Sequence, residues 1–241
     1  MTSPTTARLL SLAAALSLAM SASVQAAPVF DNGAVVGGNG LSVLTAPASI
    51  FGFGAQVGAG NRVADDFSVP VGTTWNVQGL SLFAYQTGAG AFTFTSASWQ
   101  IILGDLNAGT LVASGTDAVT NEGLVGYRVQ NTSLANTQRP IFQIGVDIAD
   151  LDLGGGSYWL TWSIGGSLAS GPWVPPTLAG NGGNAAQSIA AAAFNTLVDA
   201  NSQRGFELPF ALQGTVPEPT SLALVLAAAA AAVGTARRRK G

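Results

Sequence analysis

Hydrophobic and polar residues alternate along several short stretches of this 241-residue chain. Hydrophobic residues occupy every second position over 142–148, 158–164 and 206–212. Successive side chains of a β-strand point to opposite faces, so a period of two predicts strands with one buried face. The pattern therefore predicts an all-β protein.

Two further hydrophobic stretches change phase partway. Positions 75 and 77 are followed by 80 and 82 across Gly79, and positions 92 and 94 are followed by 99, 101 and 103 across Ser96 and Ala97. Such a change predicts a β-bulge or bend. Turn-forming residues separate the stretches at 87–90, at 104–105 and at the triple glycine 154–156. Many short strands divided by turns predict a two-sheet antiparallel β-sandwich of jelly-roll-like form.

Residues 27–214 are expected to form this sandwich as one domain, because they contain no internal repeat and no linker that would divide them. A segment of about 190 residues is long enough for one sizeable core. One stretch fits the strand pattern poorly. Residues 187–200 include four consecutive alanines, and we expect an irregular or extended segment there in preference to a short helix.

Residues 1–26 have the features of a secretory signal peptide. Arg8 supplies a positive charge, residues 9–20 form an apolar stretch, and Val24 and Ala26 place small residues at the −3 and −1 positions of a cleavage site. We expect cleavage after Ala26, with Ala27 as a competing site. The chain is therefore predicted to be exported.

Residues 215–241 combine three elements in order: the stiff tripeptide Pro217, Glu218, Pro219, an apolar run over 222–233, and the basic residues Arg237, Arg238, Arg239 and Lys240. The uncharged residues 221–236 would span ~24 Å as a helix, somewhat less than the ~30 Å hydrocarbon core of a bilayer. Bilayer thinning and snorkelling of basic side chains permit a single membrane helix with the basic residues in the cytoplasm. The alternative is an alanine-rich helix packed on the domain.

This C-terminal segment resembles the PEP-CTERM sorting signal of Gram-negative bacteria, which consists of a Pro-Glu-Pro motif, a short membrane helix and an arginine-rich end. The resemblance implies recognition by an exosortase-like membrane protease at Pro217, Glu218 and Pro219, with Arg237 to Lys240 as the basic stop. It also implies a place in the cell envelope, at the cell surface or outside the cell, in an organism that makes extracellular polysaccharide.

Two segments of the body carry a second resemblance. Residues 62–70 (Arg-Val-Ala-Asp-Asp-Phe-Ser-Val-Pro), followed by Trp-Asn-Val at 75–77, are similar to an opening common in PEP-CTERM proteins. Residues 158–162 (Tyr-Trp-Leu-Thr-Trp) and 170–173 (Ser-Gly-Pro-Trp) resemble a second segment of that group. These matches imply a secreted β-sandwich and transfer no catalytic residue.

Charge and composition narrow the classes of function. The body holds four arginines and eleven acidic residues, a net charge of −7, so nucleic acid is not an expected partner. The chain has neither cysteine nor histidine, which removes thiol and imidazole nucleophiles, bases and metal ligands. No cofactor is expected.

Acidic residues leave two candidate sites. Asp65 and Asp66 are adjacent, so alternation places them on opposite faces of a strand, whereas a glycosidase needs two carboxylates about 5–10 Å apart across a cleft. Asp147, Asp150 and Asp152 precede a glycine-rich stretch, where oxygen ligands could hold Ca²⁺. A solvated turn is the preferred interpretation of the latter, and neither group is assigned as a catalytic or metal site.

Two tryptophans are candidates for stacking on sugar rings. Alternation places Trp159 on the face opposite Tyr158 and Leu160, and Trp173 lies in the Ser-Gly-Pro-Trp segment. The alternative is that both close the ends of the sandwich.

We therefore expect a non-enzymatic, exported surface protein with a structural or adhesive role in extracellular polysaccharide or biofilm. Two alternatives remain open: a carbohydrate-binding β-sandwich module, and a glycan-active enzyme that uses paired carboxylates. Before processing, the membrane is expected to hold the chain through its C-terminal helix.

Overall fold

The computed structural model describes residues 28–45, 48–178 and 183–217. In this part of the chain the elements are β1 (Pro28–Asp31), β2 (Leu41–Leu44), β3 (Phe53–Gly54), the short 3-10 helix η1 (Val57–Ala59), β4 (Arg62–Ala84), β5 (Phe94–Leu103), β6 (Thr110–Gln130), β7 (Pro140–Gly166), β8 (Trp173–Val174), β9 (Ala186–Ser188), β10 (Asn195–Thr196) and β11 (Phe210–Thr215). The prediction of an all-β fold is confirmed.

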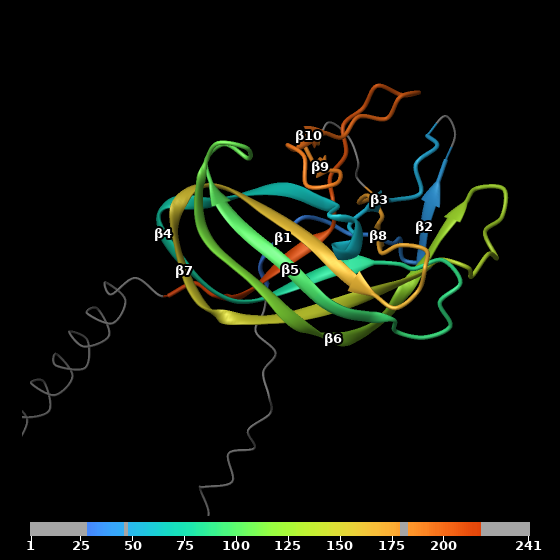
Figure 1. Ribbon diagram of the computed structural model, residues 1–241, viewed down its shortest axis with the longest axis horizontal. Coiled ribbons are helices and arrows are strands. Elements are labelled where there is room, and N and C mark those ends of the chain that lie inside the picture. The colour runs from blue at the N-terminus through green and yellow to red at the C-terminus, as the bar shows by residue number, and fades with distance from the viewer. Residues whose placement is uncertain (1–27, 46–47, 179–182, 218–241) are drawn as a thin grey trace, which may run out of the picture.

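Within the described residues, nine strands form one sheet, and β3 and β8 form a second sheet of two strands (Figure 1). The main order is β1-β11-β4-β7-β5-β6-β2, with β9 pairing with β4 and β10 pairing with β9. The pairs are antiparallel except β2 with β6, which run parallel. The prediction was two separate antiparallel sheets. The described strands do not show such a separation, because long strands run from one half of the main sheet into the other.

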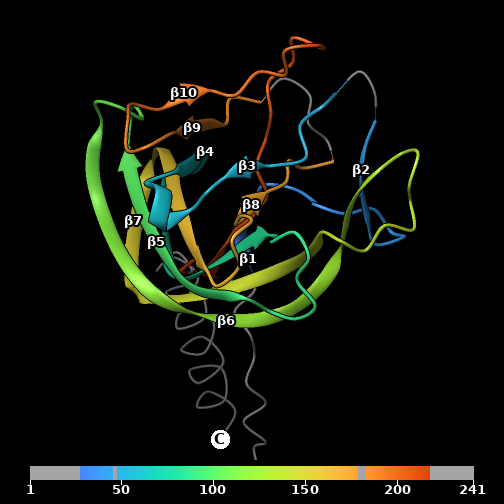
Figure 2. The ribbon, with the colours of Figure 1, turned by 45° about the vertical axis from the view of Figure 1, so that its right-hand side comes forward.

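Strand β4 shows how the sheet is continuous. Its residues 63–69 pair with the end of β7, which also pairs with β5, and these strands form the first half of the sheet. Its residues 79–84 pair with the beginning of β7 and with β11, and these strands form the second half. Strand β6 likewise pairs first with β5 and then with β7. Figure 2 shows these long strands curving around the centre of the molecule, so that the two halves of the sheet face each other.

The core lies between these two halves. From the first half Trp162 packs against Phe210 of the second half, with ring centroids 5.7 Å apart. Phe67 contacts the same Phe210 ring at 6.2 Å. The predicted phase changes are present: register shifts lie between Val77 and Gly79 and between Phe94 and Ser96. These bulges keep the hydrophobic residues on the inner face as the strands bend.

The triple glycine 154–156 was expected to be a turn, and this prediction is wrong. All three residues lie inside β7, where Gly154 pairs with Thr74 and Gly156 with Val69. A Cβ atom on Gly155 would lie 2.7 Å from the Cα of Val71, so glycine allows the two bending strands to approach closely. Because β7 continues through these glycines, Asp147, Asp150 and Asp152 lie within a strand and not in a turn at its end.

The alanine-rich stretch 187–200 is extended and irregular, as predicted. It holds the end of β9, a turn and β10, and Ala190 and Ala191 have positive φ angles of 51° and 61°. Such angles are incompatible with a continuing right-handed helix.

The predicted terminal elements lie outside the described residues. These are the signal peptide with Ala26, the residues Glu218 and Pro219 of the sorting motif, the apolar run 222–233 and the basic residues Arg237 to Lys240. Pro217 is described, and it is exposed two residues after β11. No helix among the described residues is both long and apolar enough to cross a membrane.

Candidate functional site

The outer face of the first half of the sheet is largely polar. Side chains that alternate with the core residues of β4, β5 and β7 point to this face. The cross-strand pairs on it are Asp66–Trp159–Ile102, Ala64–Thr161–Gln100 and Ser163–Ser98. The face thus carries hydroxyl and amide groups, with Trp159 at one end.

A cleft of about 610 Å³ lies against this face. One wall is the segment from Ile189 to Phe194, called here the strap, which joins β9 to β10. The cleft, called the strap cleft, is lined by Val57, Gly60, Arg62, Ser98, Gln100, Ile102, Leu106, Asn107, Ser163, Ser188 and the strap residues Ala191, Ala192, Ala193 and Phe194. Its volume is in the range of small-molecule and oligosaccharide-sized sites.

Asn107 fixes one end of the strap. Its side-chain amide accepts a hydrogen bond from the backbone N–H of Phe194 at 2.9 Å and donates one to the Phe194 carbonyl at 3.1 Å. Asp105 positions Asn107, because its carboxylate accepts hydrogen bonds from the backbone N–H groups of Asn107 and Ala108. Figure 2 shows the turn after β5 beside the turn that leads into β10. Phe194 is therefore held in the wall of the strap cleft.

The other end of the strap is tied to the segment before β4. The side-chain carbonyl of Asn61 accepts a hydrogen bond from the Ala190 N–H at 3.0 Å, and the Gly60 carbonyl accepts one from the Ala191 N–H at 2.8 Å. Ser188 donates its hydroxyl to the Ala192 carbonyl at 2.6 Å. These bonds compensate the cost of positive φ at two alanines and keep the strap away from the sheet.

Arg62 is the charged residue of the strap cleft. Its Nη1 donates a hydrogen bond of 2.6 Å to Gln100 Oε1, two strands away across β7. Among the described residues Arg62 forms no ion pair with a carboxylate. Thr161 on β7 pairs with Gln100 and is fully buried, and no described residue forms a hydrogen bond with its hydroxyl. The floor of the cleft thus offers free N–H donors next to a row of hydroxyl and amide groups.

The two predicted sugar-stacking residues have different surroundings. Trp159 is half-buried on the outer face, where it pairs with Ile102 of the cleft lining. Trp173 packs against the small hydrophobic cluster of Val35, Tyr85 and Ile141, and its indole N–H donates to Ser170 at 3.3 Å. Trp159 therefore lies beside a residue of the strap cleft without lining the cleft itself, while Trp173 lies elsewhere.

Comparison of the sequence with known proteins does not assign the chain to a family. No family model matches the chain, and no curated protein matches it in sequence. The resemblance to PEP-CTERM proteins accordingly stays a prediction from the quoted motifs. Two of those motifs, 62–70 and 158–162, include strand residues of the polar outer face.

Asp65 and Asp66 lie on opposite faces, as expected: Asp65 is fully buried and Asp66 half-buried. Their carboxyl groups are nevertheless close together. One oxygen of each lies within 4.8 Å of the other and of a carboxylate oxygen of Glu207. Asp65 bends back to accept the Asp66 N–H at 2.9 Å, which explains their proximity.

Asp65 joins three segments of the chain. Its carboxylate accepts hydrogen bonds from the Leu208 N–H at 2.6 Å and from the Asn32 side chain at 2.9 Å. Burial raises the pKa of Asp65 to about 8, the Leu208 N–H acts against this rise, and the charge of Glu207 adds to it. With its oxygens satisfied by protein donors, this acidic group has a structural role in the described fold.

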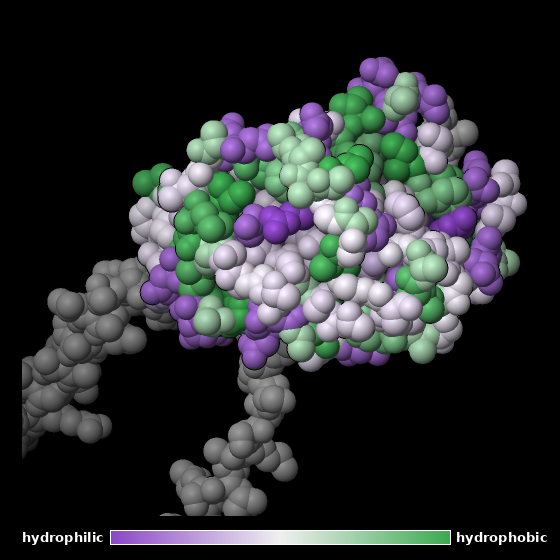
Figure 3. Space-filling model, in the orientation of Figure 1, coloured by the Kyte–Doolittle hydropathy of each residue, from purple (hydrophilic) through white to green (hydrophobic). Residues whose placement is uncertain are grey.

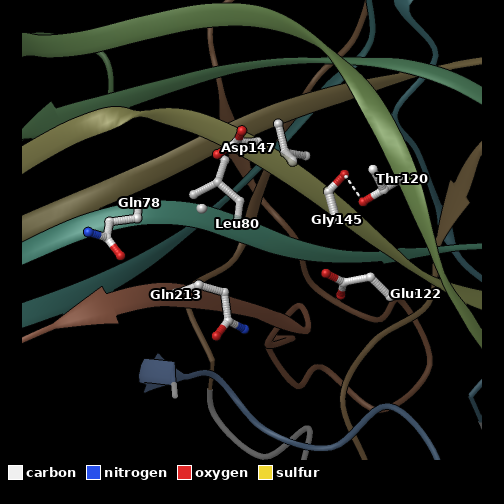
Figure 4. A pocket seen from close by; sticks show the side chains of 9 residues that line it. Gln78, Leu80, Thr120, Glu122, Gly145, Asp147 and Gln213 are labelled. Carbon is white, nitrogen blue, oxygen red and sulfur yellow. Dashed lines mark hydrogen bonds between the residues drawn. The ribbon is translucent and has the colours of Figure 1, made fainter. Parts of the chain in front are cut away.

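A second hollow of about 250 Å³ lies on the outer face of the other half of the sheet (Figure 4). Glu122 of β6 and Gln213 of β11 both line it. Glu122 accepts hydrogen bonds from Gln143 at 2.7 Å and from Ser81 at 3.1 Å, and Gln213 donates to Ser81 at 3.0 Å. Because these side chains bind one another, the hollow is a weaker candidate than the strap cleft.

Sequence reasoning missed most of the cleft. Arg62, Asn107 and Phe194 were not singled out, because they are far apart in the sequence and the alanines of the strap carry no chemical signal. One usable signal was present: Gly104-Asp105 was recognised as a turn, and Asn107 follows it at the spacing of an Asx-turn that exposes an amide.

Proposed function

We propose that this chain is an exported surface protein that binds extracellular polysaccharide in the strap cleft, and that this binding gives it an adhesive role. The observation that carries the proposal is the pairing of a fixed aromatic residue, Phe194, with a polar floor that contains Arg62, Gln100 and Ser163. A pyranose ring has apolar C–H faces and polar hydroxyl edges, so it fits an aromatic wall beside hydrogen-bonding side chains.

The surface supports the same proposal. On the face seen in Figure 3, hydrophilic, neutral and hydrophobic residues are interspersed. Polymers rich in hydroxyl groups are bound by neutral donors and acceptors more than by charge, and the strap cleft supplies serine, asparagine and glutamine groups for this purpose. Of the described residues that line the cleft, none is a carboxylate, so paired-carboxylate chemistry has no support there.

The location is proposed from the sequence motifs. The signal peptide would export the chain, and an exosortase-like protease would act near Pro217, Glu218 and Pro219 after the basic residues Arg237 to Lys240 had stopped transfer. The sheet that bends over one core is proposed to be a variant of the jelly-roll-like sandwich. Pro217 is exposed in the structure, which is compatible with access by a protease.

Binding is tested by affinity electrophoresis of residues 28–217 in gels that contain a neutral polysaccharide, xylan, or an acidic one, alginate. We expect retardation by at least one of them. Replacing Phe194, which lines the cleft, or Trp159, which lies beside the lining residue Ile102 on the outer face, by alanine should weaken binding about tenfold each, since each removes an aromatic surface on which a bound chain could stack. The exposed residue Val71, which is 95% accessible, supplies the control V71S and should leave binding unchanged.

Two results would contradict the proposal: no retardation of the unsubstituted protein by either polymer, or retardation that survives both aromatic substitutions. Circular dichroism of each variant separates loss of binding from loss of fold.

A further inference from the structure

Arg128 is a buried cation that pairs with no carboxylate among the described residues. It is 4% exposed on β6, and each of its donating nitrogens faces a neutral acceptor. Nε donates to the Phe51 carbonyl at 2.9 Å, Nη2 to the Ile50 carbonyl at 2.9 Å and Nη1 to the Ser42 hydroxyl at 3.0 Å. A guanidinium has five N–H groups, so two remain after these bonds.

The surroundings of Arg128 increase its positive field. The guanidinium of Arg139 lies over the Phe51 ring, 3.9 Å from its centroid. The pKa of Arg128 is lowered to about 10, mainly by burial; the charge of Tyr85 acts against this shift, and the charge of Arg139 adds to it. No carboxylate is among the groups that shift it. Burial of an unpaired charge is unfavourable, and a bound anion would offset that cost.

A cleft of about 260 Å³, called the Arg128 pocket, opens beside this side chain. Thr177 also lines it, is 5% exposed, and has a buried hydroxyl with no hydrogen-bond partner in the described part of the chain. The remaining lining is mostly apolar and consists of Val43, Leu44, Thr45, Ala48, Ile50, Pro176, Leu178 and Phe206. The pocket thus combines a guanidinium and a hydroxyl with a hydrophobic wall.

We propose that the Arg128 pocket binds a small monocarboxylate with an apolar body. The carboxylate would accept hydrogen bonds from Arg128 and Thr177, and the apolar part would lie against side chains such as Leu44 and Phe206. The volume is below that of typical drug-sized sites, which limits the ligand to a short or single-ring acid. This site is separate from the strap cleft and does not depend on polysaccharide binding.

The test uses benzoate as the carboxylate and benzamide as its uncharged counterpart. Calorimetric titration of the purified full-length protein should show saturable binding of benzoate and none of benzamide, and benzoate should raise the melting temperature. Sodium chloride at equal ionic strength controls for general salt effects. Equal binding of both compounds, or no saturable benzoate binding, overturns the proposal.

Thr177→Val is the variant that keeps shape and removes the hydroxyl. We expect it to fold, to melt at a temperature no lower than the unsubstituted protein, and to bind benzoate about tenfold more weakly. Thr93 is the matched control, because its hydroxyl is also buried and unpartnered but lies outside the pocket. T93V should bind benzoate as the unsubstituted protein does. If T177V retains full affinity, the pocket does not bind the carboxylate in the way proposed.

Discussion

Asp65 is the carboxyl group whose protonation the fold changes most clearly. Burial raises its pKa from 3.8 to about 8, and nearby Glu207 contributes to the rise through its charge and a shared hydrogen bond. Asp66 and Asn32 also face this group. Between these two pKa values the folded protein holds a proton that the unfolded chain has released, so folding takes up a proton in this range.

The sign of the stability change follows. The contribution of Asp65 to the free energy of unfolding is fully present below the unfolded pKa of 3.8, and it is lost as the pH rises through the folded pKa of about 8. In this window the free energy of unfolding should fall by up to about 1.4 kcal/mol per pH unit from this group. Glu207→Gln removes the neighbouring charge, so the pKa of Asp65 should fall and the loss of stability with pH should become smaller.

Urea denaturation at a series of pH values measures this difference. Asp150→Asn serves as control, because Asp150 is an exposed carboxylate on β7, and its pH profile should follow that of the unsubstituted protein. Superimposable profiles for E207Q and the unsubstituted protein would contradict the assignment of the coupling to Glu207.

At the level of elements, the Phe194 end of the strap depends on the side chain of Asn107. The Phe194 N–H donates to Asn107 Oδ1, so Asn107→Ala leaves this N–H without its protein acceptor. Hydrogen exchange at the Phe194 amide should accelerate about tenfold, whereas the free energy of unfolding should change by no more than about 1 kcal/mol. Polysaccharide retardation should weaken as well, because Phe194 is no longer held in the cleft wall.

Asn136→Ala provides a matched control in the turn before β7, where Asn136 Oδ1 accepts the Gln138 N–H at 2.8 Å. It should leave Phe194 exchange unchanged. Unchanged exchange at Phe194 in N107A would show that the strap is held in some other way.

The strands themselves were predictable where the alternation was strict. The stretches 142–148 and 158–164 both form strand, but they are parts of the single strand β7. The three glycines between them indicated a turn, because composition alone does not show that Gly156 and Gly154 pair with Val69 and Thr74 of β4. Local sequence thus predicted the alternation, while the length of β7 depends on a distant partner.

The site was predictable only in part for the same reason. Alternation placed Trp159 on the outer face, and this needs no knowledge of other strands. The contact of Asn107 with Phe194 joins residues 87 positions apart, and the bond from Arg62 to Gln100 crosses β7. Neither contact has a periodic signature in the sequence. The parallel pairing of β2 with β6 was not predicted either, because it also joins segments that are far apart in the sequence.

For the whole molecule, the continuous sheet has a consequence for cooperativity. Strands β4, β6 and β7 each contribute to both halves, and one hydrophobic core joins Trp162 of the first half to Phe210 of the second. A core shared in this way cannot be lost from one half without exposing the other. We therefore expect one unfolding transition for residues 28–217.

Leu80→Ala tests this expectation, because Leu80 is 1% exposed in the second half of the sheet. The substitution should cost about 2–5 kcal/mol of unfolding free energy. If the halves are one unit, slow amide exchange should accelerate equally at Ile101 in the first half and at Ile144 in the second. Leu111→Ala, at a residue 54% exposed, should cost less than about 0.5 kcal/mol. Acceleration at Ile144 with unchanged exchange at Ile101 would mean that the halves unfold separately.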